Sequence, residues 1–82
     1  MNEIFTIYDK KSATYGGLYQ FPNQDVAKRA FASQEFASSN SLVIQYPEDF
    51  DIYSLGTFNI DTGVVVSRVV FVSNFKEVLK HV

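Results

Sequence analysis

Residues 46–72, with the sequence YPEDFDIYSLGTFNIDTGVVVSRVVFV, constrain the fold more than any other part of the chain. Residues 52–60 are rich in β-branched and aromatic side chains, a short connection containing Gly63 follows, and residues 64–72 are rich in valine. Two such runs joined through a short glycine-containing connection predict a β-hairpin. Pro47 cannot donate a backbone hydrogen bond and acidic residues are poor strand formers, so residues 46–49 are predicted to be an entry loop.

The return strand of this hairpin is apolar on both faces. Successive side chains of a strand point to opposite sides, so Val64, Val66 and Val70 share one face with Arg68, while Val65, Val69 and Phe71 share the other with Ser67. The outgoing strand is similar, and Gly56 lies where a β-bulge could switch its faces. A sheet that is apolar on both sides needs two covers.

The rest of the chain supplies a single substantial cover. Residues 3–8 form a predicted first strand, with Phe5 and Ile7 on one face and Ile4 and Tyr8 on the other. Residues 15–21 are predicted to be extended, with a bend or bulge at the two glycines. Asn23 can cap one long helix over residues 24–38, whose apolar side chains recur every three or four positions. Residues 42–45 are interpreted as an irregular link, with a short strand as the alternative, and a short helix runs from Phe75 to about residue 81.

These elements define the expected fold. We expect a single domain over residues 1–82 of the α+β class, in which a small antiparallel sheet of three or four strands carries one long helix on one face and a short C-terminal helix. Because one helix covers one face, the other face is either covered by a second copy of the chain, in a homodimer, or left partly open as an aromatic binding platform.

Composition narrows the function classes. The chain has no cysteine, so it contains no disulfide, thiolate metal site or cysteine nucleophile, and its apolar runs are too short to predict a transmembrane segment or signal peptide. We expect no cofactor, no metal and no membrane partner. Seven Lys and Arg against nine Asp and Glu give a net charge of -2, which argues against a protein that must neutralise many phosphates.

Three motifs resemble one family. They are D-x-K at Asp9 and Lys11, A-x-R-A-F at residues 27–31, and P-E-D-F-x-x-Y-x-L-G-T-F-x-x-x-T-G at residues 47–63. Together they resemble the small nonstructural protein of gokushoviruses, which are phages of the microvirus group with circular single-stranded DNA genomes. Proteins of that family are described as DNA-binding and as acting when genomes are copied or packaged, so the resemblance implies single-stranded DNA as the ligand and the host cytoplasm as the location. It implies no catalytic residues.

Binding of single-stranded DNA requires aromatic side chains for the bases and cations for the phosphates. Beside the glycine-containing segment, Tyr8, Tyr15 and Tyr19 are the candidate stacking residues, and half-buried packing is the alternative for each. The candidate phosphate contacts are Lys10, Lys11, Lys28, Arg29 and Arg68. Arg68 interrupts a valine-rich strand, so it is a candidate first for a dimer-interface ion pair, next for protection of an edge strand and last for a phosphate contact.

An enzymatic function has little support in the sequence. His81 is the single histidine and lies one residue from the C-terminus, so we expect neither a histidine metal cluster nor a Ser-His-Asp triad within one chain. Glu48, Asp49 and Asp51 are grouped, but their spacing does not match a calcium loop. Two hypotheses therefore stand: a non-catalytic, dimeric accessory protein that binds phage single-stranded DNA, and a dimeric interaction or regulatory module that binds phage or host proteins and not DNA.

Overall fold

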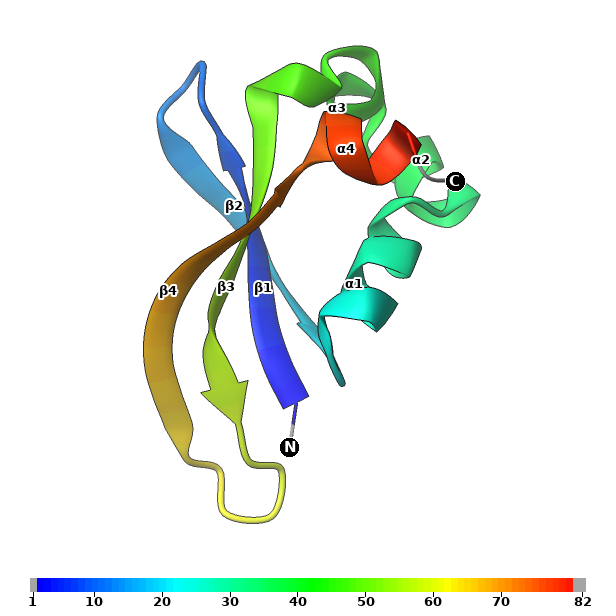
Figure 1. Ribbon diagram of the computed structural model, residues 1–82. Coiled ribbons are helices and arrows are strands. Elements are labelled where there is room, and N and C mark those ends of the chain that lie inside the picture. Colours follow the sequence, from blue (N-terminus) through cyan, green and yellow to red (C-terminus); the bar gives the residue numbers. More distant parts are fainter. Residues whose placement is uncertain (1, 81–82) are drawn as a thin grey trace.

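The computed structural model describes residues 2–80, and Figure 1 shows a twisted sheet with helices on one side. The elements, in chain order, are β1 (Asn2–Asp9), β2 (Thr14–Phe21), α1 (Gln24–Phe31), α2 (Gln34–Ser39), α3 (Ser41–Gln45), a 3-10 turn (Pro47–Asp49), β3 (Phe50–Phe58), β4 (Val65–Asn74) and α4 (Phe75–Lys80). All three strand pairings are antiparallel, and the strand order is β2-β1-β3-β4. The α+β class, the four-stranded sheet, the hairpin and the extended segment before Pro22 are thus as the sequence predicts.

The helices pack on one face of the sheet, and the core lies between them and the strands. Phe5 and Ile52 are fully buried there, against Ala27 and Phe31 of α1 and Phe75 at the start of α4. Phe31 is the centre of this core, because its ring contacts those of Tyr19, Phe21, Phe36 and Phe75. Figure 1 shows no helix on the opposite face of the sheet within residues 2–80, so that face is uncovered.

The prediction of one long helix over residues 24–38 is wrong. The first helix ends at Phe31 and a second begins at Gln34, because Ser33 leaves helical geometry with φ -73° and ψ 157°. Its hydroxyl donates to the carbonyl of Ala30 at 2.6 Å and accepts from the backbone N–H of Phe36 at 3.2 Å. A serine that bonds the backbone on both sides replaces the helical hydrogen bonds at this point and caps the next helix.

Residues 42–45 are not an irregular link but most of the short helix α3. Asn40 starts it, because its carbonyl accepts from the N–H groups of Val43 and Ile44, at 3.1 and 3.3 Å. The Asn40 side chain meanwhile donates to the carbonyl of Phe36 at 2.9 Å and so closes the end of α2. Burial of Val43 then ties α3 to the core. The C-terminal helix is confirmed through Lys80; its predicted end at residue 81 lies outside the described residues.

At Gly56 the backbone of β4 leaves no room for a side chain on β3. The φ of Gly56 is +138°, and a Cβ there would lie 1.9 Å from the carbonyl oxygen of Val66. The pairing of β3 with β4 shifts register between Ser54 and Gly56. The sequence prediction of a bulge at Gly56 is therefore confirmed, and only glycine fits this contact without displacing the strands.

Candidate functional site

Four aromatic side chains form a row across the whole sheet, with one ring from each strand. In strand order they are Tyr15 of β2, Tyr8 of β1, Tyr53 of β3 and Phe71 of β4, and we call this set the aromatic row. Neighbouring ring centroids are 4.6 Å apart for Tyr15 and Tyr8, 6.0 Å for Tyr8 and Tyr53, and 5.7 Å for Tyr53 and Phe71. Tyr15 and Tyr53 are themselves 5.8 Å apart, so the three tyrosine rings form a compact cluster that Phe71 extends toward the β4 edge.

Strand alternation and register place these rings together. Phe5 and Ile7 of β1 point into the core, so Tyr8, next along the strand, points to the uncovered face. Tyr8 is the register partner of Tyr15, and Tyr53 is the partner of Phe71. Tilted and edge-on contacts between the rings stabilise the cross-strand pairs.

The two ends of the aromatic row are open to solvent. Tyr15 and Phe71 are each 54% exposed, whereas Tyr8 and Tyr53 are half-buried between them. Leu18 of β2, whose side chain is 71% exposed, extends the apolar surface beside Tyr15. Burial raises the pKa of Tyr53 above its usual 10.0, and nearby Asp51, Tyr15 and Tyr8 act in the same direction. Tyr53, at the centre of the row, is therefore neutral at physiological pH.

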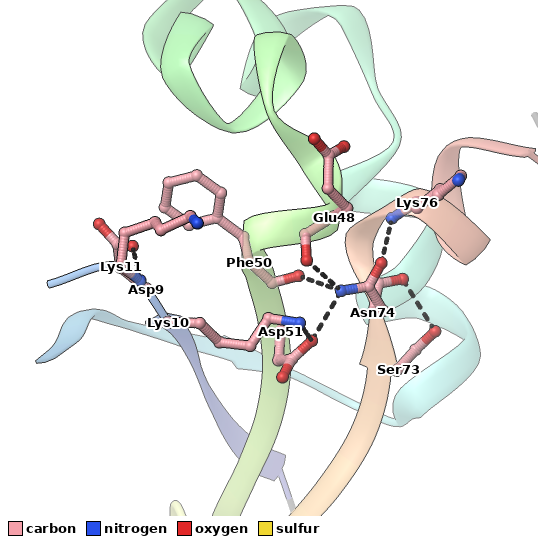
Figure 2. Close-up of polar contacts among 9 residues, drawn as sticks. All are labelled: Asp9, Lys10, Lys11, Glu48, Phe50, Asp51, Ser73, Asn74 and Lys76. Carbon is pink, nitrogen blue, oxygen red and sulfur yellow. Dashed lines mark hydrogen bonds and ion pairs between the residues drawn. The ribbon is translucent and has the colours of Figure 1, made fainter. Parts of the chain in front are cut away.

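Two lysines lie at the end of the sheet where Tyr8 and Tyr15 lie. Lys10 and Lys11 occupy the turn between β1 and β2. Figure 2 shows the Lys10 side chain reaching toward Asp51, and its Nζ lies 3.8 Å from Asp51 Oδ1. The same carboxylate oxygen accepts from Asn74 Nδ2 at 2.8 Å. Asp51 thus neutralises part of the charge of Lys10, while Lys11 is exposed.

The structure brings together three of the eight residues predicted from sequence. Tyr8 and Tyr15 lie on the uncovered face, and Lys10 reaches Asp51, the register partner of Tyr8, at the same end. Lys11 belongs to the same turn but lines a hollow with Tyr46 and Phe50. Tyr19 lies on the helix side instead, with its ring 5.2 Å from that of Phe31.

The other predicted cations lie away from the aromatic row. Lys28 and Arg29 belong to α1 and line an open pocket with Ser73 and Glu77. Arg68 lines a hollow between β4 and the start of α1, together with Glu3 and Gln24. These three side chains therefore do not share a surface with the lysines of the turn.

Sequence reasoning missed Tyr53 and Phe71 as members of the site. Both residues were assigned to strands, but whether their side chains lie on the same face of the sheet depends on the strand register. The pairing of β3 with β4 is irregular, because β4 carries extra residues at two places. The available signal was the hairpin itself, because residues near equal distance from its turn become partners.

Two further observations concern residues 2–80. In this part of the chain, no helix is long and apolar enough to span a bilayer. The same residues contain no group of three or more His, Cys, Asp or Glu side chains placed to hold a metal ion.

Fold and site together define a small sheet-and-helix domain whose one uncovered face is aromatic. The chain belongs to the Phage ORF5 protein family, whose model matches residues 2–78. It is 39% identical over 62 residues to Protein ORF5 of Chlamydia phage 1, an alignment that covers 72% of this chain and 65% of that protein. The chain thus spans just under two thirds of the length of that curated relative, and no solved structure matches it. The resemblance to the small nonstructural protein of gokushoviruses is confirmed, and the chain is a phage accessory protein.

Proposed function

We propose that this protein binds single-stranded DNA, without catalysis, on the uncovered face of its sheet. The observation that carries the proposal is the aromatic row, which places one ring from every strand on the face that no helix of residues 2–80 covers. Bases stack on aromatic side chains largely independently of sequence, and each stacked base contributes about 1–3 kcal/mol. A row of rings offers a binding surface rather than a nucleophile, so the proposal includes no chemical step.

The exposed ends of the row are its primary stacking positions. Tyr15 and Phe71 present about half of their surface to solvent, which leaves room for a base against each. Tyr8 and Tyr53 hold these two rings in place through direct ring contacts on either side of the row's centre. We expect bases to contact the two outer rings first and a strand of DNA to run across the sheet between them.

Phosphate contacts contribute less to this binding than stacking does. Lys10 and Lys11 are the cations of the turn that follows Tyr8; Lys10 is paired with Asp51, and Lys11 lines a hollow with Tyr46 and Phe50. For single strands, each phosphate contact contributes about -0.7 to the slope of log K against log salt. Two contacts therefore predict a slope of about -1.4, which is shallow for a DNA-binding protein and agrees with the net charge of -2.

Fluorescence anisotropy with a labelled oligodeoxynucleotide tests the proposal. Phe71→Ala and Tyr15→Ala should each weaken binding roughly 5- to 150-fold, the equivalent of one stacked base. Val26→Ala is the control, because Val26 is 38% exposed and lies in α1, on the helix side. Absence of binding by the unmodified protein at low salt would refute the proposal, as would equal losses in the control and in Tyr15→Ala.

The second candidate is a module that binds phage or host proteins and not DNA. The observation that favours it is the exposed valine surface of β4, which includes Val65, Val66 and Val69 at 55–58% exposure. Exposed contiguous apolar surface is typical of protein interaction sites. A protein that ignores the oligonucleotide at low salt but remains folded would favour this second function.

A further inference from the structure

The outer edge of β4 is an apolar surface that the fold leaves uncovered. β4 is the last strand of the sheet, so one side of its backbone has no strand partner within residues 2–80. The exposed apolar side chains of β4 and of the residue before it, which we call the valine edge, are 38–58% exposed and consist of Val64, Val65, Val66, Val69, Val70 and Phe71. Long apolar edges of this kind are ready to pair with another strand.

The valine edge is also nearly free of charge. Residues 62–75 contain one charged side chain, Arg68, and no acidic one, although the chain as a whole carries nine Asp and Glu. The net negative charge of the protein therefore does not oppose contact between two such edges. Arg68 and the register shifts of β4 disfavour indiscriminate strand addition, because charges and bulges protect sheet edges.

We propose that β4 pairs antiparallel with β4 of a second copy of this chain, about a two-fold axis near Val69. Val69 lies at the middle of the strand, and its side chain is 58% exposed. This register places Arg68 opposite Val70 of the second copy instead of opposite its Arg68, so like charges do not face each other. A closed two-fold pair also leaves no second valine edge free to continue into a fibre.

The lack of acidic side chains along the edge favours a second copy as the occupant, because the chain is acidic elsewhere. At the ends of the paired strands, this register places Asp61 of one copy opposite Glu77 of the other, with Lys76 next to it. The ends therefore add no specific ion pair, and the association depends on the strand itself.

The size of the edge sets the strength of the pair. Ten residues of strand are about 33 Å long, and six half-exposed apolar side chains offer on the order of 300 Å² per copy before the backbone is counted. That area, about 600 Å² for the two copies together, is below the roughly 1,200 Å² of stable complexes, so we expect a weak pair that depends on the backbone hydrogen bonds between the two strands.

Pairing would double the proposed binding surface. With the axis perpendicular to the sheet, both copies present their aromatic rows on the same side, and the two Phe71 ends lie toward the shared edge. The result is an eight-stranded sheet with rings on one face. This consequence rests on the proposed function, whereas the pairing itself does not.

Sedimentation velocity without DNA tests the pairing directly. The unmodified protein should shift from one to two chain masses as its concentration rises, and Val69→Lys should remain at one. Leu42→Lys is the matched control, because Leu42 is an apolar residue of α3 that is 57% exposed. A single-chain mass at every concentration, or association of Val69→Lys equal to that of the control, would overturn the proposal.

Two glutamate variants test the register. Val70→Glu places its carboxylate opposite Arg68 of the second copy, whereas Val69→Glu places two carboxylates opposite each other, so Val69→Glu should weaken dimerisation several-fold more. Equal weakening by the two variants would overturn the antiparallel register. Because these measurements contain no DNA, they can succeed while the anisotropy experiment fails, or the reverse, so the two proposals are tested separately.

Discussion

Replacing Gly56 with alanine should destabilise the protein more than any other glycine substitution in the chain. The new Cβ would lie 1.9 Å from the Val66 carbonyl oxygen, 2.9 Å from its carbon and 3.1 Å from the Arg68 nitrogen. All three are backbone atoms of β4, so relief requires the strands to separate. Overpacking of this kind costs about 1–3 kcal/mol, and an L residue at φ +138° costs about 1–3 kcal/mol more.

The two costs together are a large part of the stability available. A domain of 82 residues has an unfolding free energy of about 4–12 kcal/mol, so a loss of about 2–6 kcal/mol lowers the thermal midpoint by more than ~8 °C. Urea unfolding followed by far-ultraviolet circular dichroism would measure the loss.

Two other glycines separate the clash from the strain. Gly63 has φ +76° but nothing within 4 Å of an added Cβ, so Gly63→Ala should show strain alone, about 1–2 kcal/mol. Gly17 has open space and no left-handed φ, so Gly17→Ala should be near neutral. If Gly56→Ala is no more destabilising than Gly63→Ala, the close approach of β3 and β4 is not as described.

Two more predictions concern single side chains. Tyr53 has a raised pKa in the folded state, so its stabilising contribution is fully present below about pH 10 and is lost as the pH rises through the folded-state pKa. In urea titrations at alkaline pH, Tyr53→Phe should therefore lose less stability with rising pH than the unmodified protein does. An equal loss of stability in both proteins would contradict this prediction. Asn74 donates to the carbonyls of Glu48 and Phe50 and to the carboxylate of Asp51 (Figure 2), so Asn74→Ala should lower the free energy of unfolding by about 2–3 kcal/mol in the same assay. Asn2, whose side chain makes one exposed hydrogen bond to Gln20, is the control, and Asn2→Ala should cost less than ~0.5 kcal/mol.

The sheet was predictable because its signals are local. Alternation in residues 3–8 correctly assigned Phe5 and Ile7 to one face and Tyr8 to the other, and Gly63 correctly marked the hairpin connection. The broken helix was not predictable from periodicity, since Phe31 and Phe36 both reach the core and the apolar spacing continues across the break. The break depends on which backbone groups the Ser33 hydroxyl bonds, and a serine in a helical pattern does not reveal that by itself.

The candidate site was predictable only in part, because it is assembled across strands distant in sequence. Tyr8 and Tyr15 belong to one local hairpin, so their proximity followed from the chain itself. Tyr53 joins them because β3 pairs with β1 and not with β2, a choice of strand order that no local pattern encodes. Lys28 and Arg29 lay within the expected helix, but its packing directs them to a pocket with Glu77, away from the uncovered face.

Folding alone gives an incomplete account of the aromatic row. Cross-strand ring contacts contribute about 0.5–1.5 kcal/mol per pair, which accounts for the half-buried Tyr8 and Tyr53 at the centre. Stability of the fold explains Tyr15 and Phe71 less well, because each leaves more than half of its surface in water. A Thr or Val at these edge-strand positions would expose less apolar area. The rings that contribute least to burial are the ones most accessible to a ligand. Stability and base stacking therefore depend on different members of the same row, which is why substitutions at its ends can test binding while the fold is retained.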